Sequence, residues 1–178
     1  KMKKKFTIGF IGMTHLGLNY SAVSAEKGNK VVCFDSNKRK IQDLIDEKIY
    51  ISEPRLGETV KKNKHRIVFT NNIEDLKVCE IVYISSDVRT NKKNESSLSD
   101  IRLLIKKIIK VVNKSTFLVI LCQVPPGFVR NINFNKKFLY YQVETLVFGD
   151  AIQRALKPER IIIGAEDDHF PDNKFKKY

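Results

Sequence analysis

A pair of glycines near the N-terminus constrains the fold of this chain more than any other feature. Gly12 and Gly17 follow the apolar run Phe6 to Ile11 and open a segment with helical periodicity that ends at Gly28. They stand at the first and last positions of the pattern G-x-G-x-x-G, which marks a strand, a tight turn and a helix. Such a turn directs the amide N–H groups at the start of the helix toward a phosphate. The sequence therefore predicts a phosphate-binding βαβ unit at the beginning of the chain.

An acidic residue follows at the distance that this pattern requires. Asp35 ends the second apolar run and lies 23 residues after Gly12, close to the spacing of about 20 expected for an acid that binds the adenosine ribose. Its carboxylate accepts hydrogen bonds from the ribose hydroxyls and disfavours a 2′-phosphate, so the pattern favours NAD over NADP. Two alternatives share these residues: a βαβ unit whose glycines serve only packing, and a methyltransferase that binds S-adenosylmethionine.

Apolar runs alternate with segments of helical periodicity along the rest of the chain. We expect strands at Phe6 to Ile11, Lys30 to Phe34, Arg66 to Thr70, Glu80 to Ser85, Thr116 to Leu121, Phe138 to Gln142 and Arg160 to Ile163. We expect helices from Gly12 to Lys27, Lys38 to Ile45, Leu56 to Val60, Leu98 to Val112 and Gly149 to Leu156. This alternation predicts an α/β fold of the Rossmann type, a doubly wound parallel sheet with helices on both faces.

Ligands of such sheets bind beyond the carboxyl ends of the strands. The loops expected there are Gly12 to Gly17, Asp35 to Lys38, Ser85 to Thr90 and Cys122 to Gly127. The candidate cofactor-binding residues in them are Gly12, Met13, Thr14, His15, Leu16, Gly17, Asp35, Lys38, Ser86 and Cys122. Thr14 replaces the middle glycine, and its hydroxyl is expected to donate to a phosphate oxygen unless the side chain obstructs the ligand. His15 either approaches a phosphate or is an exposed residue of the first helical turn.

Composition excludes several other classes of protein. The net charge of +13 raises the possibility of a nucleic-acid binder, but the lysines are scattered over every segment and no nucleic-acid-binding motif occurs. No apolar run approaches the roughly 20 residues of a membrane helix. The three cysteines are too few for a disulfide framework and favour a reducing, cytoplasmic setting. No metal site is predicted.

Further segments together indicate one family. They are Phe34-Asp35, Ser52-Glu53-Pro54-x-Leu56, Ser85 to Ile101, Val124-Pro125-Pro126-Gly127, Gln142 to Leu146, Gly149-Asp150-Ala151 and Pro158 to Ile161. Because these segments occur in this order and spacing, the chain resembles the NAD-binding domain of the UDP-glucose/GDP-mannose dehydrogenases over about Phe6 to Ala165. The resemblance removes most of the support for a methyltransferase.

The resemblance implies an oxidoreductase of polysaccharide biosynthesis. Its relatives oxidise the primary alcohol of a nucleotide sugar, such as UDP-glucose, to a carboxylate with NAD through a cysteine-bound intermediate. The nucleophilic cysteine and the sugar site belong to later parts of these proteins. We therefore expect a cofactor domain at residues 1–165, a connection at 166–178 toward a missing helical dimerisation domain, and a homodimer in the full-length protein. The chain alone is expected to be inactive.

The resemblance also suggests site residues and shows departures from the family. Glu144 is retained as an acid near the reaction centre, although it also fits a carboxylate that caps the helix at Gly149. Gln123 stands where the family has a threonine that helps to hold a catalytic water, so Glu144 and Gln123 are the catalytic candidates. Val88 replaces a threonine that contacts NAD, and Phe148 replaces a second glutamate. These replacements favour, as an alternative, a non-catalytic nucleotide-binding or sensing module.

Overall fold

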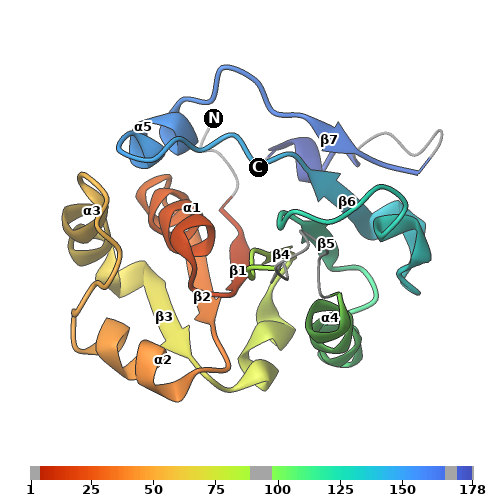
Figure 1. Cartoon of the computed structure of the whole chain (residues 1–178), viewed down its shortest axis with the longest axis horizontal. Coiled ribbons are helices and arrows are strands. Elements are labelled where there is room, and N and C mark those ends of the chain that lie inside the picture. The colour runs from red at the N-terminus through yellow and green to blue at the C-terminus, as the bar shows by residue number, and fades with distance from the viewer. Residues whose placement is uncertain (1–4, 89–97, 167–171, 178) are drawn as a thin grey trace, which may run out of the picture.

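The computed structural model describes residues 5–88, 98–166 and 172–177. The described residues form a seven-stranded sheet with the order β3-β2-β1-β4-β5-β6-β7 (Figure 1). Its strands are β1 (Thr7–Ile11), β2 (Lys30–Phe34), β3 (Ile67–Thr70), β4 (Ile81–Ile84), β5 (Phe117–Ile120), β6 (Leu139–Gln142) and β7 (Ile163–Gly164). β1 to β6 are parallel, in the order of doubly wound nucleotide-binding sheets. The predicted fold class is confirmed.

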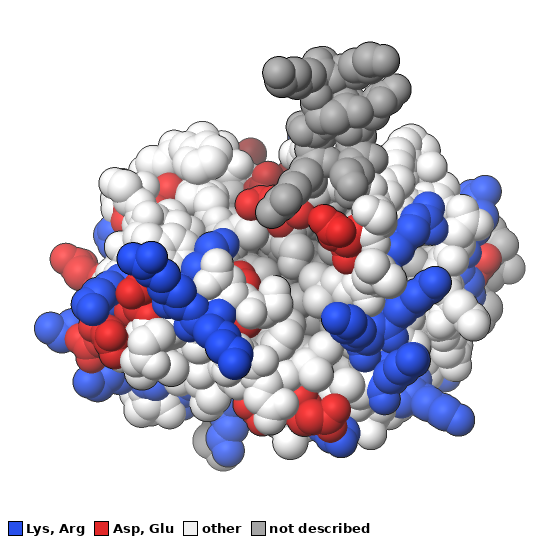
Figure 2. Space-filling model, turned by 60° about the horizontal axis from the view of Figure 1, so that its bottom comes forward, with Lys and Arg blue, Asp and Glu red and all other residues white. Residues whose placement is uncertain are grey.

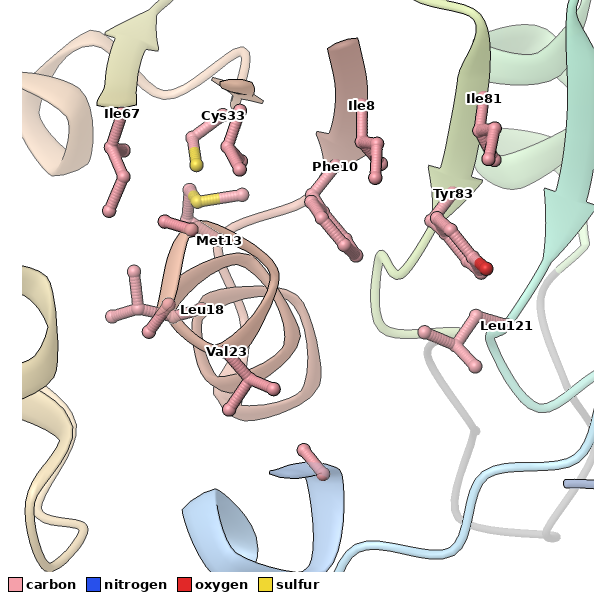
Figure 3. Packing of buried hydrophobic residues seen from close by; sticks show 14 of the residues in the cluster. Ile8, Phe10, Met13, Leu18, Val23, Cys33, Ile67, Ile81, Tyr83 and Leu121 are labelled. Atoms are coloured by element: carbon pink, nitrogen blue, oxygen red, sulfur yellow. The ribbon is translucent and has the colours of Figure 1, made fainter. Parts of the chain in front are cut away.

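Helices cover both faces of this sheet. The helices are α1 (His15–Glu26), α2 (Lys38–Ile45), α3 (Leu56–Lys62), α4 (Ser99–Val111) and α5 (Ala151–Leu156). α1, α2, α3 and α5 pack their buried side chains on one face, and α4 packs on the other. The buried side chains form one hydrophobic cluster on each face of the sheet. In the first cluster, on the side of the sheet that faces α1, the rings of Phe10 of β1 and Tyr83 of β4 stack at 5.1 Å between centroids (Figure 3).

The two clusters explain why the strands read as continuous apolar runs. Successive side chains of a strand point to opposite faces, so Phe10 enters the first cluster and Ile11 the second. All four residues of β4 and all four of β5 are buried. A parallel sheet covered on both faces has no solvent side, and polar residues are therefore excluded from both positions of the alternation.

The last strand differs from the prediction. We expected a parallel strand at Arg160 to Ile163, but β7 covers only Ile163–Gly164 and pairs antiparallel with β6. The Val143 N–H donates to the Ile162 carbonyl oxygen at 3.0 Å and extends this pairing. A parallel strand would need a crossover connection that carries the chain back along the sheet before the strand begins. The helix in this connection is the six-residue α5, which packs beside α1, and the chain then enters β7 in the opposite direction to β6.

The C-terminal segment is anchored to the same core. Phe175 is buried, and its ring lies 4.8 Å from that of Tyr140 and 5.4 Å from that of Phe117 between centroids. Part of the loop expected at Ser85 to Thr90, and of the segment that leads to α4, lies outside the described residues.

Candidate functional site

One row of paired residues marks the carboxyl edge of the sheet. The row runs across five strands through Phe34, Ile11, Ile84, Ile120 and Tyr141. The chain leaves this row into the expected ligand loops after β1, β2, β4 and β5 and into the loop that carries Glu144. The direction of strand order reverses between β1 and β4, which is where doubly wound sheets bind ligands. The sheet therefore brings the predicted site segments to one edge.

Both glycines of the turn are required by close packing. Gly12 has φ +91°, and a Cβ atom there would lie 2.5 Å from the Ser86 Oγ and 2.6 Å from the Ser86 Cα. A Cβ atom on Gly17 would lie 2.0 Å from the Gly12 carbonyl oxygen. No side chain fits at either position, so the turn lies directly against the end of β4 with α1 close behind it.

Thr14 forms hydrogen bonds within the protein. Its hydroxyl donates to the Ser85 carbonyl oxygen at 2.8 Å and accepts the Gly17 N–H at 3.2 Å, which makes Thr14 the N-cap of α1. A hydroxyl has one proton to donate, and Ser85 accepts it here. In this structure the Thr14 hydroxyl joins the turn to the end of β4, and its donation to a phosphate oxygen stays a prediction.

Asp35 is bound to the glycine turn. Its Oδ2 accepts the Met13 N–H at 2.9 Å, and its Oδ1 accepts the Asn37 N–H at 2.9 Å. Each carboxylate oxygen has a second lone-pair direction, so Asp35 can still accept from a ribose. Met13 is fully buried in the cluster on the α1 face of the sheet (Figure 3). Met13 can therefore face a cofactor only through its backbone. The half-buried Leu16 packs against the same cluster.

Lys40 and Tyr50 lie beside Asp35 and were not predicted. The Lys40 Nζ is 4.0 Å from the Asp35 Oδ2, whereas the predicted Lys38 is exposed at the start of α2. The Tyr50 hydroxyl donates to the Met13 carbonyl oxygen at 2.6 Å. Burial, with a smaller effect of the Asp35 charge, raises the pKa of Tyr50 to about 12. The sequence feature that could have indicated Lys40 is its position in the first turn of α2, which Asn37 caps.

His15 points to a carboxylate rather than to open solvent. Its Nε2 lies 2.8 Å from the Glu53 Oε2, and its ring lies 4.1 Å from that of Phe148 between centroids. The Glu53 side chain is 1% exposed and also accepts the N–H groups of Gly149, at 3.2 Å, and Ala151, at 2.9 Å. Burial alone would raise the pKa of Glu53, but the hydrogen bonds from His15, Ala151 and Gly149 together hold it below its ordinary value.

Glu144 and Gln123 follow neighbouring strands. Since Ile120 pairs with Tyr141, Gln123 and Glu144 each lie three residues beyond the same register position. Gln123 is exposed, and the half-buried Glu144 accepts a hydrogen bond from the Leu146 N–H. The helix that begins at Ala151 is therefore capped by Glu53, and the alternative role of Glu144 as its cap is wrong.

Of the remaining candidates, Cys122 is buried, whereas Ser86 and Val88 are half-buried. The Ser86 hydroxyl donates to the Ile11 carbonyl oxygen at 3.3 Å, and Val88 packs against the α4 side of the core. Cys122 is buried, which raises its pKa to about 12. This thiol has the environment of a core residue and not of a nucleophile.

A cavity of about 710 Å³ opens beside the turn Pro125-Pro126-Gly127, between that turn and β6 and β7. None of the candidate cofactor residues lines it. The glycine turn, by contrast, lies where the strand order reverses and where Asp35 meets the start of α1.

Comparison with known proteins agrees with this geometry. Residues 6–176 match the family described as the UDP-glucose/GDP-mannose dehydrogenase family, NAD binding domain. The chain belongs to this family. It is 32% identical over 180 residues to a UDP-glucose 6-dehydrogenase of Rickettsia bellii, covering 96% of the chain and 42% of that protein. It is 34% identical over 176 residues to the UDP-glucose 6-dehydrogenase TuaD of Bacillus subtilis, covering 92% and 38%.

Solved structures of the family share the fold. A UDP-glucose dehydrogenase from Pyrobaculum islandicum superposes with a TM-score of 0.82 at 20% identity, over 94% of this chain and 42% of that one. A GDP-mannose dehydrogenase from Pseudomonas aeruginosa gives 0.81 at 19% identity, over 99% and 44%. The chain thus spans about 40% of the length of these relatives.

The residues present fit the family's cofactor. Gly12 and Gly17 let the turn pack directly against the end of β4 and the start of α1, and the first N–H groups of the 12-residue α1 have no acceptor within the helix. Together with the helix dipole they can bind a pyrophosphate. Within residues 5–88, 98–166 and 172–177 no cluster of metal-ligating side chains occurs, and no helix in those ranges has the length and hydropathy needed to span a membrane.

Proposed function

We propose that this chain binds NAD at the glycine turn and is the cofactor domain of a nucleotide-sugar dehydrogenase. The observation that carries the proposal is the hydrogen bond between Asp35 and the Met13 N–H. It joins the acid that would accept from the adenosine ribose to the turn that would hold the pyrophosphate, so both parts of one dinucleotide site are placed before the ligand arrives. NAD, when bound, would accept a hydride from the alcohol of the substrate.

Each residue at the edge of the sheet has a defined role in this proposal. Asp35 accepts from the ribose hydroxyls and repels a 2′-phosphate, and Lys40 at 4.0 Å offsets part of that repulsion. The N–H groups of His15 and Leu16 face the pyrophosphate. Glu144 and Gln123, which follow adjacent strands, are proposed to hold and deprotonate a water at the reacting carbon.

The whole protein is proposed to act on a UDP-glucose-like substrate and to form a homodimer. The substrate rests on the names of the relatives and on the share of their length that the chain spans, and the homodimer is what the family resemblance implies. Residues 1–165 would form the cofactor domain, and 166–178, anchored by the buried Phe175, would lead toward a helical dimerisation domain. Three unpaired, buried cysteines are compatible with the cytoplasm.

Calorimetry with NAD and NADP tests the cofactor assignment. We expect NAD to bind at least about tenfold more tightly than NADP, since a hydrogen bond to a charged group contributes roughly 1.5–3 kcal/mol. Asp35→Ala should weaken NAD by about tenfold and remove most of the preference. Asp46→Ala, the same change of charge at the exposed far end of α2, is the matched control. Equal or tighter NADP binding by the parent chain would contradict the proposal.

A non-catalytic sensing module is the second candidate, and one observation favours it. Phe148, where the family has a glutamate, is 79% exposed beside His15, so an aromatic surface replaces an acid near the site. A nucleic-acid binder is less well supported. On the face shown in Figure 2, basic residues gather in separate groups on two flanks, with acidic residues between them, rather than in one stripe.

A further inference from the structure

Glu53 joins its own loop to two segments that are far from it in the sequence. Its carboxylate lies in the loop before α3, contacts His15 at the first position of α1, and accepts the N–H groups of Gly149 and Ala151 at the start of α5. The side chains of His15 and Glu53 are 20% and 1% exposed. One buried carboxylate therefore fixes the relative positions of α1 and α5.

A cap for α5 does not by itself require this arrangement. Asp, Asn, Ser or Thr at the N-cap would satisfy the helix start locally, and Asp150, at that position, makes no side-chain cap. A buried ionised carboxylate is costly unless hydrogen bonds satisfy both of its oxygens. Here the Oε2 has His15 and Gly149 as partners, and the Oε1 has Ala151. The long-range carboxylate adds a link to α1 that a local cap would lack.

The residues that Glu53 links belong to two parts of the proposed site: His15 to the cofactor turn, and Gly149 to the loop that carries Glu144. His15 is the first residue of α1, and its backbone N–H is one of the groups that would face the cofactor pyrophosphate. Gly149 belongs to the loop between β6 and α5, which also carries Glu144. Phe148, in the same loop, lies over the His15 ring at 4.1 Å between centroids. A shift of His15 on cofactor binding would therefore act on this loop through Glu53 and Phe148.

We propose that Glu53 is a positioning residue that couples the cofactor turn, through His15, to the loop of residues 143–150 that carries Glu144. The inference rests on the proposed binding of NAD at the glycine turn. Glu53 touches neither cofactor nor substrate in this role: it sets where the loop lies when the turn is occupied.

Amide hydrogen exchange at Gly149 and Ala151 tests the coupling. We expect saturating NAD to slow exchange of these amides by at least about threefold in the wild-type chain, because the occupied turn holds His15 and therefore Glu53 in place. His15→Phe keeps an aromatic ring against Phe148 but removes the imidazole nitrogen that contacts the Glu53 carboxylate. In this variant, and in Glu53→Gln, NAD at a concentration that saturates the variant should no longer slow these amides. Glu58→Gln, the same substitution at an exposed position of α3, should behave as wild type.

A merely structural role of Glu53 predicts a different result. Glu53→Gln would then speed exchange at Ala151, but His15→Phe, which removes no contact of that amide, would leave both its exchange and the effect of NAD unchanged. That outcome with His15→Phe overturns the coupling. A wild-type chain that fails to bind NAD in calorimetry overturns the proposed function and this inference with it, whereas NAD binding without slower exchange overturns the inference alone.

Discussion

Thr14 stands where the dinucleotide pattern has its middle glycine, and its hydroxyl is used within the protein. It donates to the Ser85 carbonyl oxygen and accepts the Gly17 N–H. Ser85 is buried, so its carbonyl would lose this donor if the hydroxyl were removed. A residue that could be expected to meet the ligand instead holds the turn against β4, and its first effect should be on stability.

Thr14→Val tests this role. We expect the free energy of unfolding to fall by about 1–3 kcal/mol, because the variant loses a helix cap and leaves a buried carbonyl without its donor. Thr14→Ser keeps the hydroxyl and should lie within about 1 kcal/mol of the parent. Urea denaturation measures both. If Thr14→Val is as stable as the parent, the cap contributes nothing and the hydroxyl is free to serve a ligand.

At the scale of elements, Glu53 replaces the local caps that α5 lacks. α5 has six residues, too few to be stable alone, and it depends on its packing beside α1 and on the bonds to Glu53. The strands need no such help, since their burial on both faces determines their positions. The short helix is therefore the element whose stability should depend most on the ionisation of one side chain.

The pH dependence of stability should show this contribution. Hydrogen bonds hold the pKa of Glu53 below its ordinary value of 4.5, although burial acts in the opposite direction. Its contribution is therefore present above the unfolded-state pKa and is lost as the pH falls through the lower folded-state pKa. The stability difference between the parent and Glu53→Gln, measured by urea denaturation, should be largest near neutral pH and shrink in acid. A difference that grows in acid would contradict this assignment, and Glu58→Gln is the control.

At the scale of the whole molecule, all three cysteines of the chain are buried in environments that do not favour a nucleophilic thiolate. Burial raises the pKa of Cys33, Cys79 and Cys122 to about 12 in each case, so none of these thiols is ionised near neutral pH. The relatives are more than twice as long as the stretch that this chain matches. The cysteine expected for a covalent intermediate would have to come from another part of such a protein.

We therefore expect no steady oxidation of UDP-glucose by this chain alone. NADH fluorescence in the presence of UDP-glucose and NAD should remain at the level of a control without protein, even when calorimetry shows NAD bound. Sustained NADH formation, abolished by Asp35→Ala, would mean that the reaction needs no cysteine from elsewhere.

The glycine turn, the alternation of strands and helices, and Asp35 were determined by the sequence alone, because each depends on local geometry. A glycine at φ +91°, an apolar run buried on both faces, and an acid one strand later leave a signal within a few residues.

The tertiary structure decided which partners those residues meet. The hydroxyl of Thr14 bonds a carbonyl 71 residues away, and His15 meets a carboxylate 38 residues away. Such pairs depend on how helices and strands pack against one another, which no local spacing encodes. For the same reason Lys40 rather than Lys38 lies beside Asp35, Glu53 rather than Glu144 caps α5, and β7 runs antiparallel.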